Sequence, residues 1–280
     1  MPINPDAVGS KSDPVASSWD SKDGLIYAVG IGAGPDELAF STENTMETPQ
    51  RIFPTQAVVL APMGPGLEAI GDFNPAMLVH GEQAIRLHGE IPVEGSGTTV
   101  AEVTAIYDKV KGAVIEITAD TSDADTGEAL FTNVTTIFIR GEGGWGGERG
   151  PSGPKNVAPD RDPDHSVSYT TGEDQAFTYR LSGDRNPLHT DPSFAAFGGF
   201  DRPILHGLCS YGFTGRALLH TLCGSDPTRF TGMEGRFSKP VFPGETLTVK
   251  MWNDDDGAVF KTFDEAGDAV IDGGRCTFTS

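Results

Sequence analysis

Apolar and polar residues alternate along three consecutive stretches in the first half of the chain. These stretches are residues 98–109 (TTVAEVTAIYDK), 113–120 (AVIEITAD) and 128–141 (EALFTNVTTIFIRG), and short turn-like segments join them. Alternation with a period of two is typical of strands that bury one face. Because tight connections make neighbouring strands antiparallel, the first half is predicted to end in an antiparallel meander.

The second half ends in the same kind of pattern but also contains an almost continuous apolar segment. Strands are predicted within residues 229–242, 245–253, 258–267 and 268–280, with a turn at 253–257 (NDDDG). Residues 206–223 (HGLCSYGFTGRALLHTLC) leave little room for a polar face, and a helix that is apolar on most sides is a buried helix. Gly212 and Gly215 are expected to let a sheet approach this helix closely.

These patterns together predict an α+β fold in which a curved antiparallel sheet wraps around a central helix. The unit is expected twice, with the first copy less clear. Residues 141–165 are rich in Gly, Pro and charge and are predicted to be a linker. The predicted divisions are a flexible N-terminus (1–22), an N-terminal repeat (23–140), the linker (141–165) and a C-terminal repeat (166–280).

Composition excludes several classes of protein. The net charge is −20 over 280 residues, which argues against a nucleic-acid partner because nothing offsets phosphate repulsion. The three cysteines imply neither a disulfide framework nor a metal site. The polar start of the chain does not resemble a signal peptide, and no apolar run reaches membrane length. We therefore expect a cytoplasmic protein without a membrane partner.

Two acid-rich stretches are predicted to be hairpin turns rather than metal sites. Residues 120–128 (DTSDADTGE) lack the spacing of a calcium-binding loop, and residues 254–256 (DDD) lie in the predicted turn of the second half. Three histidines, His88, His165 and His220, belong to no candidate chemical group in the sequence and are expected to be surface or core residues.

Residues 181–191 (LSGDRNPLHTD) gather an acid, an amide and an imidazole around one proline. Pro187 fixes its own φ and pushes Asn186 towards an extended conformation, so a defined turn is predicted. Asp184 and His189, five residues apart across this turn, can point into one space. Asp191 is predicted to cap a short helix (PSFAAF) that begins with proline.

An acid and an imidazole that converge can hold and activate a water molecule. The alternative is purely structural: Asp184 and Asn186 cap backbone groups, and His189 packs at an edge. Spacing alone leaves both open. Gly207 opens the predicted buried helix, so its N–H lies at the positive end of the helix dipole, where an oxyanion is stabilised. A water-activating pair with one oxyanion donor suits addition of water next to a carbonyl.

The segment YRLSGDRNPLHTDPSFAAFGGFDRPILHGLCSYGF resembles the signature region of the hydratase 2 (MaoC-like) family of (R)-specific enoyl-CoA hydratases, or 3-hydroxyacyl-CoA dehydratases. LVHGEQ, IYDKVKG, GEGGWGGERG and RFSKPVFPGETL resemble further stretches of the two-repeat, long-chain members, from about residue 25 onwards. The resemblance implies a double hot-dog fold whose N-terminal repeat has lost its long helix, which leaves space for bulky acyl chains. It also implies a homodimer.

Carried over by position, the resemblance implies that Asp184 and His189 are the catalytic pair and that Asn186 supports the loop. The pair would hold a water that adds to the β-carbon of a trans-2-enoyl-CoA and gives a (3R)-3-hydroxyacyl-CoA. The Gly207 N–H would stabilise the thioester oxygen, and no metal or redox cofactor is required. The acyl-CoA substrate is expected to contact His80, Gly81, Lys109, Arg185, Pro187, Leu188 and Phe237, with Arg236 and Lys239 adding a basic patch.

Three other functions remain open on the sequence. A hot-dog acyl-CoA thioesterase would use a carboxylate and water to attack the carbonyl carbon instead. A non-catalytic acyl-CoA-binding subunit would need neither Asp184 nor His189. A dehydratase acting on carrier-protein-bound acyl chains would have to dock an acidic partner on an acidic surface, which is unfavourable except at a local basic patch.

Overall fold

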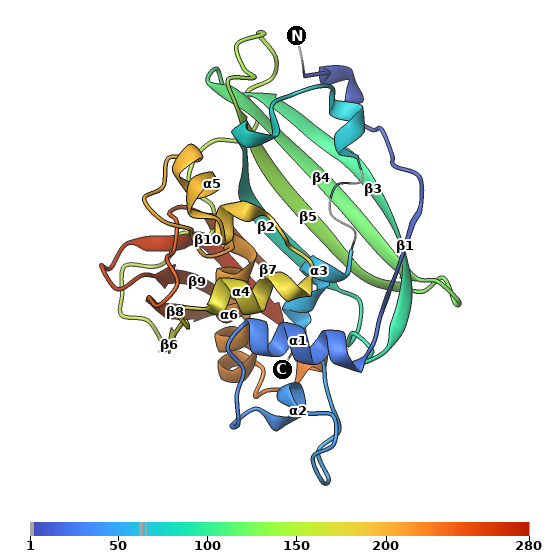
Figure 1. The fold of residues 1–280 in the computed structure, drawn as a ribbon, viewed down its shortest axis with the longest axis vertical. Helices are drawn as coiled ribbons and strands as arrows, with labels where there is room; N and C mark the ends of the chain where they lie inside the picture. Colours follow the sequence, from blue (N-terminus) through green and yellow to red (C-terminus); the bar gives the residue numbers. More distant parts are fainter. Residues whose placement is uncertain (1–2, 62–63, 65, 280) are drawn as a thin grey trace.

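One continuous antiparallel sheet of ten strands organises the part of the chain that the computed structural model describes, residues 3–61, 64 and 66–279. The sheet curls around a small group of helices (Figure 1). The strands of the N-terminal half are β1 Val15–Trp19, β2 Leu78–Leu87, β3 Gly95–Asp108, β4 Gly112–Asp123 and β5 Ala129–Arg140. Those of the C-terminal half are β6 His165–Thr170, β7 Phe230–Phe237, β8 Thr246–Asp254, β9 Gly257–Phe263 and β10 Ala269–Phe278.

The order of the strands shows that the molecule is built from two related halves. The sheet runs β1-β3-β4-β5-β2-β7-β10-β9-β8-β6, so the two halves have the same internal order and face each other across β2 and β7. These two strands pair antiparallel, with Ala84 opposite Glu234. The α+β fold with a repeated unit is confirmed.

The predicted meander strands are present, and three strands were missed. The first-half stretches correspond to β3, β4 and β5, and the turn predicted at 253–257 joins β8 to β9. The missed strands β1 and β6 are short and lie at the two edges of the sheet, where the apolar signal is weak. Strand β2 was missed because a bulge between His80 and Glu82 interrupts its alternation.

The buried helix of the C-terminal half is confirmed as α6, Gly207–Leu222. The packing around Gly212 and Gly215 differs from the expectation, because their closest neighbours are side chains of the N-terminal segments before β2 and not the sheet. A Cβ atom on Gly212 would lie 2.3 Å from the side chain of Ile31, and one on Gly215 would lie 2.2 Å from that of Thr55. Only glycine allows this approach, so α6 is shared by both halves.

The corresponding helix of the N-terminal half is much shorter, as the resemblance implied. Helix α3, Ala57–Leu60, precedes β2 as α6 precedes β7, but it has four residues where α6 has 16. Helices α1 (Ser21–Gly30), α4 (Gln175–Tyr179) and α3 gather near the junction of the two halves in Figure 1. The remaining helices are α2, Leu38–Ser41, and α5, Pro192–Phe197. No helix in the described part of the chain is long and apolar enough to cross a membrane.

Much of the segment expected to be a flexible N-terminus belongs to the fold. Strand β1 pairs with β3, and Trp19 at its end is buried and donates a hydrogen bond from Nε1 to the Pro92 carbonyl at 2.8 Å. Ile3 and Ala7 are buried in one cluster with residues of β3, β4 and β5, among them Val103, Ile115 and Ile139. The expectation failed because an edge strand needs few apolar residues.

The expected linker contains no helix or strand between residues 141 and 164, but its start is held firmly. The carboxylate of Asp108 accepts hydrogen bonds from the N–H groups of Gly144 and Gly146, each at 2.8 Å. These bonds, with a further one from the Val110 N–H, lower the pKa of Asp108 to about 2.

Candidate active site

The loop between α4 and α5 is shaped by its own polar side chains. Gly183 has a φ of +128°, which favours glycine. Asp184 Oδ1 accepts a hydrogen bond from the Asn186 N–H at 3.1 Å, and Asn186 Oδ1 accepts one from the Leu188 N–H at 3.0 Å. Asp191 caps α5 as predicted. Backbone capping by Asp184 and Asn186 is therefore real, but it occupies only one oxygen of the Asp184 carboxylate.

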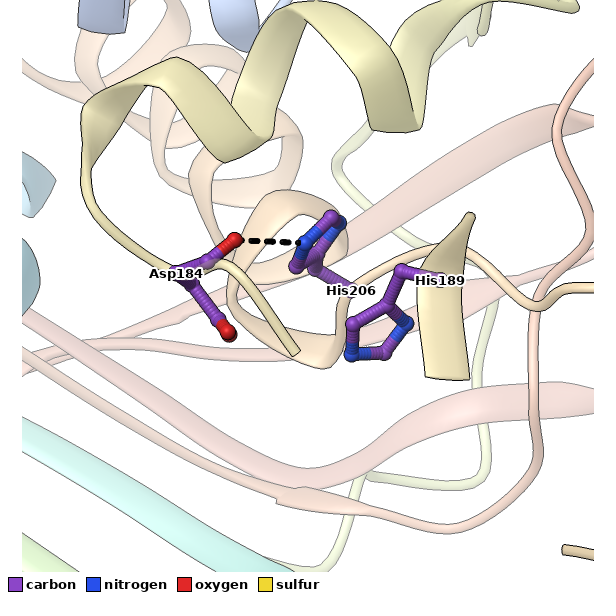
Figure 2. Close-up of side chains that lie close together, drawn as sticks. All are labelled: Asp184, His189 and His206. Atoms are coloured by element: carbon purple, nitrogen blue, oxygen red, sulfur yellow. Dashed lines mark hydrogen bonds between the residues drawn. The ribbon is translucent and has the colours of Figure 1, made fainter. Parts of the chain in front are cut away.

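The same turn brings Asp184 and His189 together, and His206 joins them (Figure 2). Each of the three side chains offers one polar atom, and these atoms lie within 4.8 Å of one another. His189 is buried, and its Nδ1 lies 2.9 Å from the Ile204 carbonyl oxygen. Because a carbonyl only accepts, Nδ1 carries the hydrogen and Nε2 is left as an acceptor.

His206 anchors the loop from behind. Its Nε2 donates to the backbone carbonyl of Asp184 at 3.1 Å, the bond drawn in Figure 2. Its ring stacks on His189 with centroids 3.8 Å apart and planes 30° from parallel. Burial lowers the pKa of both histidines, that of His206 to about 4 with a further contribution from His189, so both rings are neutral near pH 7. His206, the residue before the helix, was expected from the resemblance to orient this segment and not to act in the chemistry.

Gly207 is the first residue of α6, as predicted, and its N–H has no hydrogen-bond partner among the described residues. It lies at the positive end of a helix of 16 residues. The ring of Phe237 flanks it, 3.4 Å from where a Cβ atom on Gly207 would lie. This position suits a donor to an oxygen that becomes negatively charged.

His80 and Gly81 approach the pair from the N-terminal half. The His80 ring meets the ring of Phe237 edge-on at a centroid distance of 5.0 Å, and Gly81 occupies the bulge of β2. Burial lowers the pKa of His80 to about 4, and the nearby Asp184 carboxylate only partly opposes this effect. His80, Phe237 and Gly207 therefore form one wall beside Asp184.

The predicted basic contacts have partners or acidic neighbours within the protein. Lys109 follows the end of β3, three strands from β2, and its Nζ donates to the Pro151 carbonyl at 2.9 Å. Lys239 is paired with Asp268 at 2.6 Å. Arg236 stands opposite Glu82 and Asp272 on the two neighbouring strands. Acidic residues therefore accompany the predicted basic patch.

The three residues around the proline differ in exposure. Arg185 and Pro187 are exposed, whereas Leu188 is half-buried and reaches the end of α5, within 3.2 Å of a Cβ atom on Gly198. Their contact with a substrate stays a prediction.

The resemblance implied open space in the N-terminal half, and a cavity of about 410 Å³ adjoins Asp184. Its walls come from both halves and are formed by Ser17, Ser18, Trp19, Asp23, Gln56, Val59, Leu60, Ala61, Ser182, Gly183, Asp184 and Leu208. Most of these residues lie on β1 and on the short helical turns that end in α3. Their mixed composition carries no periodic signal, so periodicity alone could not identify them.

The acid-rich stretches form turns. Asp123 accepts hydrogen bonds from Thr126 in the connection from β4 to β5, and Asp254 pairs with Arg275 at 2.7 Å. Among the described residues, only Asp184, His189 and His206 are close enough to share an ion. One ring nitrogen of each histidine already bonds a backbone carbonyl. That the site works without a metal stays a prediction.

The fold and the site together define a double hot-dog protein with an acid–imidazole pair beside the N-terminus of its central helix. The model of the MFE-2 hydratase 2 N-terminal domain matches residues 17–141, and that of the MaoC like domain matches residues 155–273. The chain is 46% identical to 3-hydroxyacyl-thioester dehydratase Y of Mycobacterium tuberculosis, over 94% of this chain and 92% of the relative. The chain therefore belongs to the MaoC-like hydratase 2 family.

Further relatives agree with this assignment. A Dictyostelium discoideum protein named probable enoyl-CoA hydratase 2 is 42% identical, over 88% of this chain and 85% of its own. The crystal structure of a MaoC-like dehydratase from Phytophthora capsici superposes with a TM-score of 0.89 at 33% identity, covering 99% of this chain and 98% of that one. A Mycobacterium tuberculosis protein described as a double hotdog fold superposes at 0.60 and 14% identity, covering 97% and 96%, which concerns the fold alone.

Proposed function

We propose that the protein catalyses the reversible hydration of trans-2-enoyl-CoA to (3R)-3-hydroxyacyl-CoA. One observation carries the proposal: polar atoms of Asp184 and His189 lie within 4.8 Å of each other. One Asp184 oxygen and the Nε2 atom of His189 have no hydrogen-bond partner in the described part of the chain. The Gly207 N–H, also without a partner there, follows His206, the third member of this group. The names of the relatives, a 3-hydroxyacyl-thioester dehydratase and an enoyl-CoA hydratase 2, support the same reaction class.

Two acceptors side by side hold a water molecule by its two O–H bonds. A lone pair of the water oxygen then points away from Asp184 and His189 towards the β-carbon. Asp184, the carboxylate, takes one water proton as the C–O bond forms, and the pair returns a proton to the α-carbon. His206 keeps both groups in place through the Asp184 carbonyl and the ring stack.

The thioester oxygen gains negative charge as the water adds, and the Gly207 N–H donates to it. His80 and Phe237 flank the thioester, and Lys109 serves the distant phosphates of CoA. The acyl chain enters the cavity beside Asp184. The proposed reaction uses no metal or redox cofactor, and we propose that the active form is a homodimer.

The first test measures loss of the enoyl thioester absorbance with crotonyl-CoA and analyses the chirality of the product. Asp184→Asn keeps the acceptor for the Asn186 N–H but cannot take a proton, so kcat should fall by about 10²–10⁴-fold. Asp191→Asn removes a carboxylate from the same loop, and Asn caps a helix as well as Asp does, so this control should keep its activity. Release of free CoA would instead indicate a thioesterase, and tight binding without turnover would indicate a binding subunit.

The pH dependence tests His189 separately. Protonation of Nε2 would remove an acceptor from the water, so kcat/KM should decrease as the pH falls through the pKa of His189. Burial lowers that pKa from its usual 6.5, so the decrease should begin below pH 6.5. His189→Ala should show low activity without this step. A wild-type decrease centred above pH 6.5 would contradict the assignment.

A further inference from the structure

A second cavity lies at the C-terminal end of α6, away from Asp184. It has a volume of about 560 Å³, and its walls come from residues 35–40 and 48, from β6, and from the last turns of α6 and the turn that follows. The side chains in it that can do chemistry include Glu37, Arg216, His220 and Ser225, and none of these lines the cavity beside Asp184. His220 lies in the last turn of α6, about 20 Å along the helix from Gly207. The two cavities are therefore separate.

Three side chains in the second cavity form a continuous chain of hydrogen bonds. The Oε1 atom of Glu37 lies 2.5 Å from Nε2 of His220, and the Oγ atom of Ser225 lies 2.7 Å from Nδ1 of the same ring. Burial raises the pKa of Glu37, but hydrogen bonds from His220 and Arg216 outweigh it, so Glu37 is ionised at neutral pH. A carboxylate only accepts, so Nε2 of the neutral ring carries the hydrogen and Nδ1 accepts from the Ser225 hydroxyl.

The surroundings fix the positions of His220 and Glu37. The rings of Phe40 and Phe53 meet the His220 ring edge-on, with centroids 5.9 and 6.1 Å away. Arg216, one turn before His220 on α6, donates to the Glu37 carboxylate from Nε and Nη2. An imidazole that is oriented by a carboxylate on one nitrogen and bonded to a hydroxyl on the other is arranged to activate that hydroxyl as a nucleophile.

Ser225 lies on a constrained turn and is open to solvent. It has a φ of +66° and follows Gly224, whose φ is +61°. The Ser225 N–H donates to the Leu219 carbonyl at 3.1 Å, which holds the turn against the end of α6. A positive φ is unfavourable for serine, and residues held in such conformations gather at functional sites. The residue is exposed and lines the cavity, so a molecule in the cavity can reach its hydroxyl.

We propose that Ser225, His220 and Glu37 form a second catalytic site, which hydrolyses small esters through an acyl-enzyme. Ser225 Oγ forms a bond to the acyl carbon while its proton passes to His220 Nδ1, and Glu37 stabilises the resulting imidazolium. The bond between the acyl carbon and the alcohol oxygen then breaks, and His220 gives the proton to that oxygen. A water molecule attacks the acyl group in the same way, which releases the carboxylic acid and restores Ser225.

The lining of the cavity indicates which esters fit. Leu38, Ala39 and Phe40 supply apolar surface for a short acyl group or for the alcohol part. Glu37 is balanced by Arg216, which leaves Asp36 as an unbalanced charge on a chain whose net charge is −20. Uncharged esters are therefore favoured over polyanionic CoA thioesters. This activity is independent of the proposed hydration.

Hydrolysis of p-nitrophenyl acetate, an uncharged ester, tests the proposal. Ser225→Gly removes the hydroxyl and suits the positive φ at this position, so the fold should be kept. The kcat/KM for release of p-nitrophenolate should fall by about 10²-fold in this variant and in His220→Gln, as when a nucleophile or its base is lost. Ser152→Ala, which changes an exposed serine between β5 and β6, is the control and should keep the wild-type rate.

A fluorophosphonate reagent tests the nucleophile directly. Mass spectrometry should find the adduct on Ser225 in the wild type and no adduct there in His220→Gln. Crotonyl-CoA hydration should be unchanged in Ser225→Gly, because the two cavities are separate. A wild-type ester rate no higher than that of Ser225→Gly, an adduct on another residue, or ester hydrolysis that is lost in Asp184→Asn would each overturn the inference. The proposed hydration is judged by crotonyl-CoA turnover alone, so it stands or fails separately.

Discussion

The two halves of the molecule have the same strand order but use the space inside the sheet differently. In the C-terminal half, α6 fills that space and presents the Gly207 N–H and His206 at its first turn. In the N-terminal half, α3 is four residues long, and its residues Val59 and Leu60 line a cavity. Under the proposed mechanism, one repeat supplies the chemistry, and the other supplies room for the substrate.

This difference shows that one element can be shortened, beside a cavity, without changing the order of the strands. The strands of both halves retain their order, and β2 still pairs with β7. The two halves differ instead in the length of the helix that packs inside the curved sheet. Each part of this division of labour can be tested by a substitution in one half.

Among substitutions that compare the helices of the two halves, the largest effect is expected at the first residue of α6. Gly207→Pro removes the N–H, and proline is well tolerated at the first position of a helix. The preceding residue, His206, already has a ψ of 132°, which proline requires of its neighbour. We expect kcat to fall by about 10²–10³-fold, as when one oxyanion donor is lost.

Gly207→Ala is the control for this substitution, because it keeps the N–H and adds only a Cβ atom at contact distance from Phe237. Steady-state kinetics and melting temperatures of the two variants separate the donor from the packing. Full activity of a folded Gly207→Pro variant would remove Gly207 from the mechanism.

A smaller effect, on stability, is expected at the hydrogen bonds between Glu37 of the N-terminal half and α6. The carboxylate of Glu37 accepts hydrogen bonds from Arg216 Nε at 2.6 Å and from His220 Nε2 at 2.5 Å. His220 therefore has a polar partner that its neighbours in the sequence did not indicate. Burial raises the pKa of Glu37, but these bonds outweigh it and hold the pKa at about 2. Glu37→Gln should cost about 2–3 kcal/mol of the free energy of unfolding at pH 7.

The sign of the pH effect follows from this lowered pKa. The stabilisation is fully present above the unfolded pKa of about 4.5 and is lost as the pH falls towards 2, so the two proteins should converge there. Urea unfolding at several pH values measures the difference. Asp36→Asn, on the exposed neighbouring residue, should be neutral. A pH-independent difference would mean that Glu37 acts by packing alone.

The smallest effect is expected from refilling the cavity of the N-terminal half. Val59→Phe adds bulk to the cavity wall and should lower kcat/KM for a dodecenoyl thioester, relative to crotonyl-CoA, by about tenfold, since each displaced CH₂ is worth about 0.8 kcal/mol. Val29→Phe, on the exposed face of α1, is the control and should leave the ratio unchanged. An unchanged ratio in Val59→Phe would show that long chains lie elsewhere.

Long periodic segments made most of the fold predictable from the sequence. The apolar run of α6 and the alternation in β3, β4 and β5 are each strong enough to identify an element. The convergence of Asp184 and His189 was also predictable, because Pro187 restricts the turn between them. Edge strands and the helical turns around Gln56 carry no comparable pattern, so the resemblance, and not periodicity, indicated space in the N-terminal half, and neither indicated which residues would line it.

The role of His206 depends on tertiary structure alone. Its ring meets residues 22 and 17 positions earlier in the chain, Asp184 and His189, and only the packing of α6 brings them together. Local sequence restricts the catalytic loop, but the support behind it comes from the rest of the fold.

The pairing of β2 with β7 determines whether either repeat can exist alone. Separated from each other, each half would expose the backbone N–H and C=O groups of a long central strand, which is a template for association with any similar edge. The repeats are consequently not independent folding units, and a chain cut between them must reassemble across this seam before it can form the site.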